Sequence, residues 1–165
     1  MNTNLKVGGV FTFEQIRNGK VIDSWEEKNL VVDEGLDYVL DVALSAATAE
    51  TTWYLGLYEG IFTPLSTTTG ANVATNSTET TDYTPTPRPT WVEAGVTTQK
   101  VTNSVSPAAF TFTADVTVQG AFLISTCMHR QLLDTLLSAS NFTSPRVMLT
   151  NDILNVTYTI TSAAV

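Results

Sequence analysis

The chain has 165 residues, of which 43% are hydrophobic and only 15% are charged, and its formal net charge is −8. A chain of this length can bury a large core without disulfides, so we expect a single domain over residues 1–165. The acidic balance and the scattered basic residues argue against nucleic-acid binding and against an anionic membrane surface. Residues 1–6 carry no leader pattern, and no apolar run is long enough to cross a membrane, so we expect neither a signal peptide nor a transmembrane helix.

The first predicted element is a β-hairpin. Residues 7–16 and 20–25 are rich in apolar and β-branched side chains, and Asn18-Gly19 lies between them. An Asn-Gly pair readily adopts positive φ at both positions, which the tightest hairpin turns require. Thr supplies much of the polarity of the whole chain, and this β-branched residue fits a strand better than a helix.

The next segment predicts one short α-helix over residues 34–46. Asp33 is a candidate N-cap, because its side chain can accept hydrogen bonds from the first free backbone amides. The helical spacing places five apolar residues on one stripe, which we expect to pack against the core. Asp37 and Asp41 are expected to face solvent. The stripe consists of Leu36, Val39, Leu40, Ala43 and Leu44.

Residues 51–58 are aromatic and β-branched and predict a buried strand. Gly56 in its middle indicates a bulge or a close approach of another group. Residues 60–90 that follow are rich in Pro, Gly, Ser and Thr and predict a long ordered loop. The stretch 84–89 is expected to be extended, close to polyproline II. The loop is either a solvent loop or an arm that lies on a neighbouring subunit.

The second half of the chain predicts closely spaced strands. Asn151-Asp152 is expected to close a final hairpin, and residues 131–140 are expected to form a short helical turn or a plugging loop. Together these elements predict a mainly β fold, an antiparallel β-sandwich that is jelly-roll-like, with one short α-helix and a long ordered loop. The predicted strands are 91–93, 96–104, 108–118, 120–126, 145–150 and 153–162.

Residues suited to catalysis are few. Cys127 is the one cysteine, which excludes an intrachain disulfide and fits a reducing cytoplasm, and His129 is the one histidine. A Cys–His nucleophile needs a third group that orients the base, and a structural zinc site needs four ligands, so packing is the preferred interpretation of this pair. We therefore expect no enzymatic activity, no cofactor and no metal.

The acidic residues of the first half and the tryptophans allow two interpretations each. The acidic residues form a solvated face, or a patch for a basic partner. The tryptophans Trp25, Trp53 and Trp91 pack in the core, or anchor an interface. The acidic residues in question are Asp23, Glu26, Glu27, Asp33, Glu34, Asp37 and Asp41.

The order of short motifs along the chain resembles a group of small structural proteins encoded among the head genes of tailed phages. The resemblance spans residues 10–160. Such proteins usually carry a Gly-Asp turn before the final strand, and this chain has Asn151-Asp152, where Asn can also adopt positive φ. The motifs that carry the resemblance are Asn29–Leu36 (NLVVDEGL), Trp53–Leu57 (WYLGL), Pro87–Trp91 (PRPTW), Gly120–Leu123 (GAFL) and Asn151–Tyr158 (NDILNVTY).

The resemblance implies a non-enzymatic virion component, most often a capsid cement or decoration protein on the outer capsid surface, made in the host bacterial cytoplasm. Its partner would be the major capsid protein of the same phage, and it would form a homodimer or homotrimer. A tail, neck or head-fibre component and a carbohydrate- or receptor-binding module are the alternatives. Contacts are expected from an N-terminal extension, residues 1–9, and from the 60–90 arm, with Leu5, Val7, Thr67, Tyr83, Pro85 and Arg88 as candidate interface residues.

Overall fold

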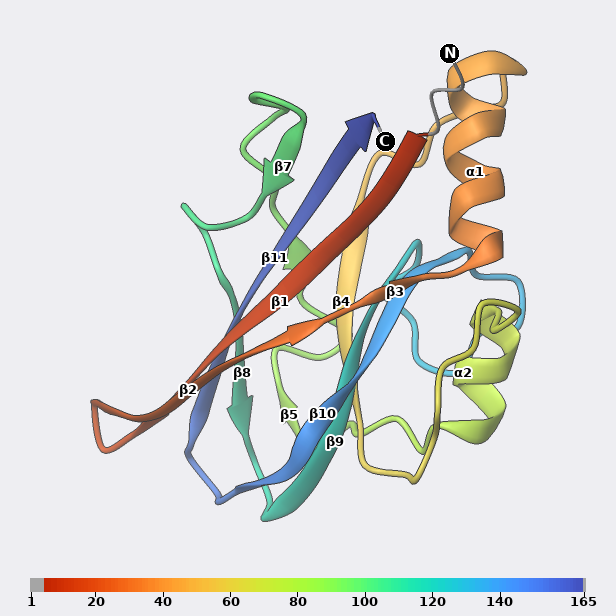
Figure 1. Cartoon of the computed structure of the whole chain (residues 1–165). Coiled ribbons are helices and arrows are strands. Elements are labelled where there is room, and N and C mark those ends of the chain that lie inside the picture. The colour runs from red at the N-terminus through yellow and green to blue at the C-terminus, as the bar shows by residue number, and fades with distance from the viewer. Residues whose placement is uncertain (1–4, 165) are drawn as a thin grey trace.

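The computed structural model describes residues 5–164, which form a mainly β protein with two antiparallel sheets and two helices (Figure 1). The six-stranded sheet has the order β2-β1-β11-β8-β5, and β7 also pairs with β11. Its strands are β1 (Leu5–Arg17), β2 (Lys20–Lys28), β5 (Tyr83–Thr84), β7 (Lys100–Thr102), β8 (Ala108–Phe112) and β11 (Ile153–Ala164).

The five-stranded sheet has the order β3-β10-β9-β4-β6. The expected strand at 51–58 is confirmed as β4, whereas the expected strands at 108–118 and 120–126 divide at a different place, because the chain turns between residues 112 and 116. The strands of this sheet are β3 (Leu30–Val31), β4 (Trp53–Tyr58), β6 (Thr90–Trp91), β9 (Val116–Ile124) and β10 (Leu136–Met148).

The predicted hairpin is confirmed. Asn18 and Gly19 have φ values of 52° and 73°, and β1 and β2 pair on either side of them. The first strand is longer than expected, since its pairing with β11 begins at Leu5. Residues 5–9 of the predicted N-terminal extension are therefore part of a sheet, and residues 1–4 of that extension lie outside the described residues.

The predicted closing hairpin is wrong. Asn151 adopts the expected positive φ of 71°, but β10 and β11 belong to different sheets, so this turn carries the chain from one sheet to the other. For residues 131–140 a short helical turn or a plugging loop was expected; the helical turn is wrong, since residues 131–135 form a loop and β10 begins at Leu136. Both errors concern pairing between segments far apart in the sequence.

One hydrophobic cluster draws side chains from both sheets. Phe11 and Phe13 of β1 meet Leu55 and Leu57 of β4 in this core. Stacked aromatic rings fill much of it, with 4.1 Å between the ring centroids of Phe11 and Tyr158. The sheets therefore share one core that water does not reach, which makes the body of the molecule rigid.

Helix α1 (Asp33–Leu44) is confirmed in position, but not in its cap or its buried face. Val32 is the N-cap residue and offers no side-chain hydrogen bond, and Gly35 is the buried residue of the helix. A Cβ at Gly35 would lie 2.4 Å from the carbonyl oxygen of Leu137, so only glycine lets the first turn approach β10 so closely. The expected stripe faces the core only in part, since Val39 packs against the core whereas Leu40 is 49% and Leu44 is 80% exposed.

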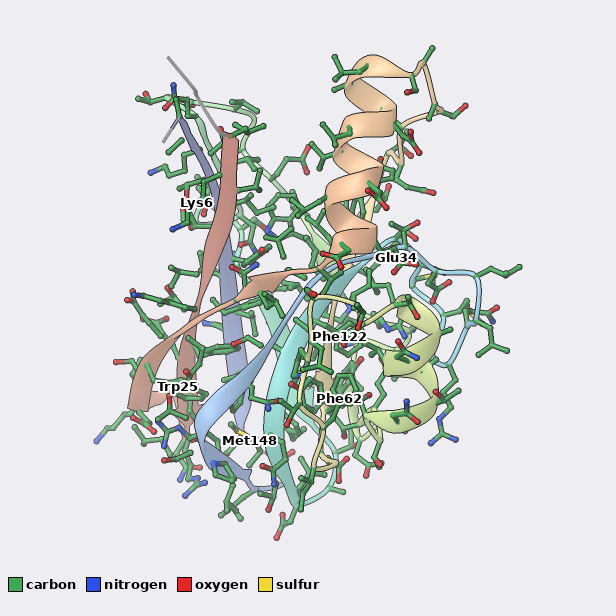
Figure 2. All side chains as sticks on the ribbon, turned by 45° about the vertical axis from the view of Figure 1, so that its right-hand side comes forward. Lys6, Trp25, Glu34, Phe62, Phe122 and Met148 are labelled. Atoms are coloured by element: carbon green, nitrogen blue, oxygen red, sulfur yellow. The ribbon has the colours of Figure 1, made fainter. Side chains whose placement is uncertain are left out.

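Glu34 fixes the first turn of this helix. Its Oε2 accepts hydrogen bonds from the backbone N–H of Gly70 at 2.9 Å and of Leu136 at 2.8 Å. One carboxylate thus joins α1, the start of α2 and the start of β10, and Figure 2 labels Glu34 at the foot of the helix. Farther along α1, the ring of Tyr38 lies 5.1 Å from that of Trp53 at the start of β4.

The 60–90 segment is more ordered than a loop. It contains α2 (Gly70–Asn76), which begins with a capping box between Thr69 and Asn72, and the short strand β5. Val73, Ser77 and Thr80 are buried. The stretch 84–89 is bent rather than close to polyproline II, with cis peptide bonds before Pro85 and Pro87. A segment with this many buried side chains is part of the body and not a projecting arm.

Gly56 meets the expectation of a close approach. The ring of Phe122 lies across it, and a Cβ at Gly56 would be 2.2 Å from Cζ of that ring. Because Phe122 is fully buried, the ring has no free space to move into.

We expect Gly56→Ala to lower the free energy of unfolding by about 2 kcal/mol in urea denaturation. Gly8→Ala is the control, since nothing lies within 4 Å of its added Cβ; equal losses in the two variants would contradict this packing.

Candidate functional site

Glu79 and Arg88 form a buried ion pair next to Phe122 of β9, in the five-stranded sheet. Nε of Arg88 donates to Oε1 of Glu79 at 2.6 Å, and its Nη2 donates to Oε2 at 2.8 Å. Both side chains are fully buried. The guanidinium carbon lies 5.2 Å from the centroid of the Phe122 ring, so the ring that covers Gly56 also supports Arg88. Two-point pairing of this kind offsets much of the cost of burying two charges.

Further groups surround this pair. Nη1 of Arg88 donates to the carbonyl oxygen of Thr126 at 2.8 Å and lies 3.7 Å from Oδ2 of Asp134. Burial raises the pKa of Asp134, and Arg88 opposes that rise. Nδ1 of His129 lies 2.9 Å from Oε1 of Glu79. The cluster ties the 77–91 segment to the 126–134 loop.

Tyr83 lies beside the cluster. Its ring is 6.1 Å from that of His129, and burial, followed by the nearby charge of Glu79, raises the pKa of its hydroxyl. His129 therefore faces a carboxylate that Arg88 already holds at both oxygens. The geometry is that of a packed structural cluster, in keeping with the packing interpretation of the Cys127–His129 segment.

Two of the candidate interface residues do not lie on the surface. Tyr83 and Arg88 are 1% and 3% exposed, so the expectation that their side chains face a partner is not met in this chain. The burial of Arg88 follows from the ion pair, because its guanidinium binds the buried carboxylate of Glu79 within the same chain. The sequence signal for it was the rarity of charge in this segment, where Glu79, Asp82 and Arg88 are the charged residues of positions 60–90.

The other four candidates are accessible but do not gather on one surface. Leu5 is exposed at the start of β1, and half-buried Val7 lines a groove of about 480 Å³ between β1 and Leu30. Thr67 lies in a second groove beside α1. Exposed Pro85 follows β5, which is in the lower half of Figure 1, whereas β1 begins at its upper end.

Exposed aliphatic side chains occur in several parts of the molecule, including Ile61 and Leu133 (both 98%), and also in the segments at one end, which we call the terminal end. It comprises the start of β1, the end of β11, the last turn of α1, and β7 with its flanking loops (Figure 1). The exposed side chains of these segments are Leu5 (65%), Leu44 (80%), Val96 (79%) and Val105 (85%). Sequence analysis named only Leu5 as an interface residue and placed Leu44 on a core-facing stripe, because an exposed and a buried aliphatic residue look the same in the sequence.

A second polar cluster joins β1 to the turn between β10 and β11. Asp152 accepts hydrogen bonds from Nε and Nη2 of Arg17, both at 2.7 Å, and from Nε2 of Gln15 at 2.8 Å. It also accepts one from the backbone N–H of Leu149 at 3.0 Å. The Arg17 hydrogen bond is the largest of the effects that lower the pKa of Asp152 to about 2.

Among residues 5–164, no three His, Cys, Asp or Glu side chains come together in an arrangement that could hold a metal ion. Neither α1 nor α2, the helices of this range, has the length and hydrophobicity that crossing a membrane requires.

Comparison with known proteins adds no relationship, because no known protein family matches the sequence and no curated protein is significantly similar to it.

Removing the guanidinium of Arg88 should strongly destabilise the folded protein. We expect Arg88→Met to lower the free energy of unfolding by about 3–5 kcal/mol, because it leaves Glu79 buried without its partner. Arg130→Met is the matched control at an exposed arginine of the same region and should change stability by less than about 0.5 kcal/mol. The double variant Glu79→Leu/Arg88→Met should recover much of the loss. Urea denaturation of the three variants measures this, and equal stability of the two single variants would contradict the ion pair.

The ionised side chain of Asp152 should make the free energy of unfolding depend on pH in the acidic range. Its folded pKa of about 2 lies below its ordinary value of 3.8, so its contribution is complete above about pH 4 and is lost as pH falls toward 2. We expect Asp152→Asn to cost about 2 kcal/mol at pH 7. The difference from the parent protein should shrink steadily between pH 4 and pH 2 in urea denaturation. A difference that stays constant with pH would show that the charge of Asp152 is unimportant.

Proposed function

We propose that this chain is a non-enzymatic structural protein of a tailed-phage particle, a capsid cement or decoration protein that binds the outer shell and bridges neighbouring capsid subunits. The motifs that resemble phage head-gene products support the phage setting. Two antiparallel sheets that share one aromatic core support the finer proposal of a jelly-roll-like β-sandwich. The major capsid protein is the proposed partner, and a homodimer or homotrimer the proposed assembly.

The observation that carries the proposal is the terminal end. Val96 and Val105, in the loops that flank β7, expose 79% and 85% of their surface, while the aromatic core beneath is fully buried. Exposed aliphatic side chains on a rigid body favour a protein-binding surface, and the terminal end carries four of them from separate segments. A clamp on a pressurised shell needs a rigid body with an apolar contact of this kind, and a specific contact buries more than about 1,000 Å².

The tryptophans weigh against a carbohydrate-binding module. Trp91 is buried, and Trp25 and Trp53 are half-buried. Trp25 stacks on Phe13 and is covered by Arg146, whose guanidinium carbon lies 4.6 Å from the ring. A sugar platform needs an open aromatic face, so the core-packing interpretation of these residues is the better supported one.

Binding to capsids tests the proposal directly. Purified protein is mixed with capsids that lack it, and co-sedimentation and the temperature of capsid rupture are measured. We expect stoichiometric binding, a higher rupture temperature, and about tenfold weaker binding for Val96→Ser/Val105→Ser, which removes apolar contact area. Val21→Ser/Ile22→Ser is the matched control, because these exposed residues lie at the start of β2, in the hairpin away from the terminal end.

Two results would contradict the proposal. If the parent protein does not bind capsids, the cement function is wrong, and tails, necks and head fibres are tested next with the same variants. If both double variants lose binding equally, the terminal end is not the contact surface.

A further inference from the structure

The outward face of α1 presents leucines among aspartates. Asp37, Leu40, Asp41 and Leu44 are spaced three or four positions apart, so they are neighbours on the helix surface. All four are exposed. The opposite side makes the contact with the body, through Gly35 and through Val39, which packs against the core. The exposed face is therefore the side of α1 that points away from the body, and it is separate from the side that packs.

This face is unfavourable for an isolated helix. Asp33, Asp37 and Asp41 repeat like charges at four-residue spacing, which destabilises a helix by about 0.2–0.5 kcal/mol per pair. Over residues 5–164, none of these three carboxylates takes part in an ion pair. Leu40 and Leu44 also leave 49% and 80% of their surface exposed to water. A partner that supplied cations and apolar surface would relieve both costs together.

A groove adjoins the same face. It has a volume of about 500 Å³ and runs between α1 and the segment that precedes α2. Its walls include Asp33, Asp37 and Asp41 on one side and Thr67 and Thr69 on the other, and none of its lining residues is basic. The groove offers space for side chains beside the leucines, and the charge of its walls favours cations.

We propose that this face of α1 binds a cationic amphipathic helix of a partner protein, with Lys or Arg on either side of a short apolar stripe. The apolar stripe would cover Leu40 and Leu44, and the basic side chains would reach Asp37 and Asp41. Nucleic acid is repelled by these carboxylates, and a small cation does not use the leucines. The twelve residues of α1 span about 18 Å, which suits about three turns of a partner helix.

The inference deepens the proposed function. The identification of the partner as a capsid subunit rests on that function. It names α1 as a contact surface and a basic amphipathic segment as what that surface recognises. The chemistry of the α1 face stands on its own residues and can be measured without capsids.

The test uses a synthetic fluorescent 14-residue helical peptide with leucines at positions i, i+3, i+4 and i+7 and lysines on both flanks. Fluorescence anisotropy with the full chain should show saturable binding that weakens as salt rises. Leu40→Ser should weaken binding about tenfold, and Asp37→Asn/Asp41→Asn should do so to a similar extent. A scrambled peptide of the same composition should bind at least tenfold more weakly.

The matched control removes the same charge elsewhere. Glu14→Gln/Glu26→Gln also takes away two exposed carboxylates, but from the six-stranded sheet, and should leave peptide binding unchanged. If this control weakens binding as much as Asp37→Asn/Asp41→Asn, attraction by net charge explains the result and the inference is overturned. Absence of saturable binding to the parent protein also overturns it.

Capsid binding separates this inference from the proposed function. Peptide binding without capsid binding would support the α1 surface and reject the cement function. Capsid binding that neither Leu40→Ser nor Asp37→Asn/Asp41→Asn affects would support the cement function and reject the α1 surface as its contact.

Discussion

The pairing of the first strand with the last is the constraint on which the six-stranded sheet depends. β1 and β11 pair from Leu5 opposite Ala164 to Ile16 opposite Ile153. β2 attaches to the free side of β1, and β7 and β8 attach to the free side of β11. The same pairing brings the two ends of the described chain to the terminal end (Figure 1). The surface that carries the proposed function is thus assembled from segments far apart in the sequence.

A continuous series of contacts links β4 and β9 of the five-stranded sheet to the buried ion pair of the 60–90 segment. Gly56 leaves room for the Phe122 ring, the ring supports Arg88, and Arg88 holds Glu79. Each step needs the one before it, because a side chain at Gly56 would displace the ring on which the guanidinium rests. The 60–90 segment owes its compact form to this arrangement, although its composition is that of a loop.

The sequence predicted local structure well and long-range structure poorly. Asn18-Gly19 specifies its turn through its own backbone preferences, and β4 follows from its aromatic and β-branched side chains. The exposure of Leu40 could not be predicted, because helical spacing shows which residues share a face but not whether another element covers it. Arg88 was misplaced for a related reason, since a lone arginine among prolines looks the same whether it meets solvent or a buried carboxylate.

The carboxylate of Glu34 has a consequence for the kinetics of association. Its two backbone hydrogen bonds, to Gly70 and Leu136, hold the first turn of α1 against both neighbouring elements. The helix therefore loses its orientational freedom when the chain folds, and a partner that docks on it later does not have to remove that freedom again. Pre-ordering of this kind raises affinity without any added contact, and in related complexes such gains in affinity are seen mostly as slower dissociation.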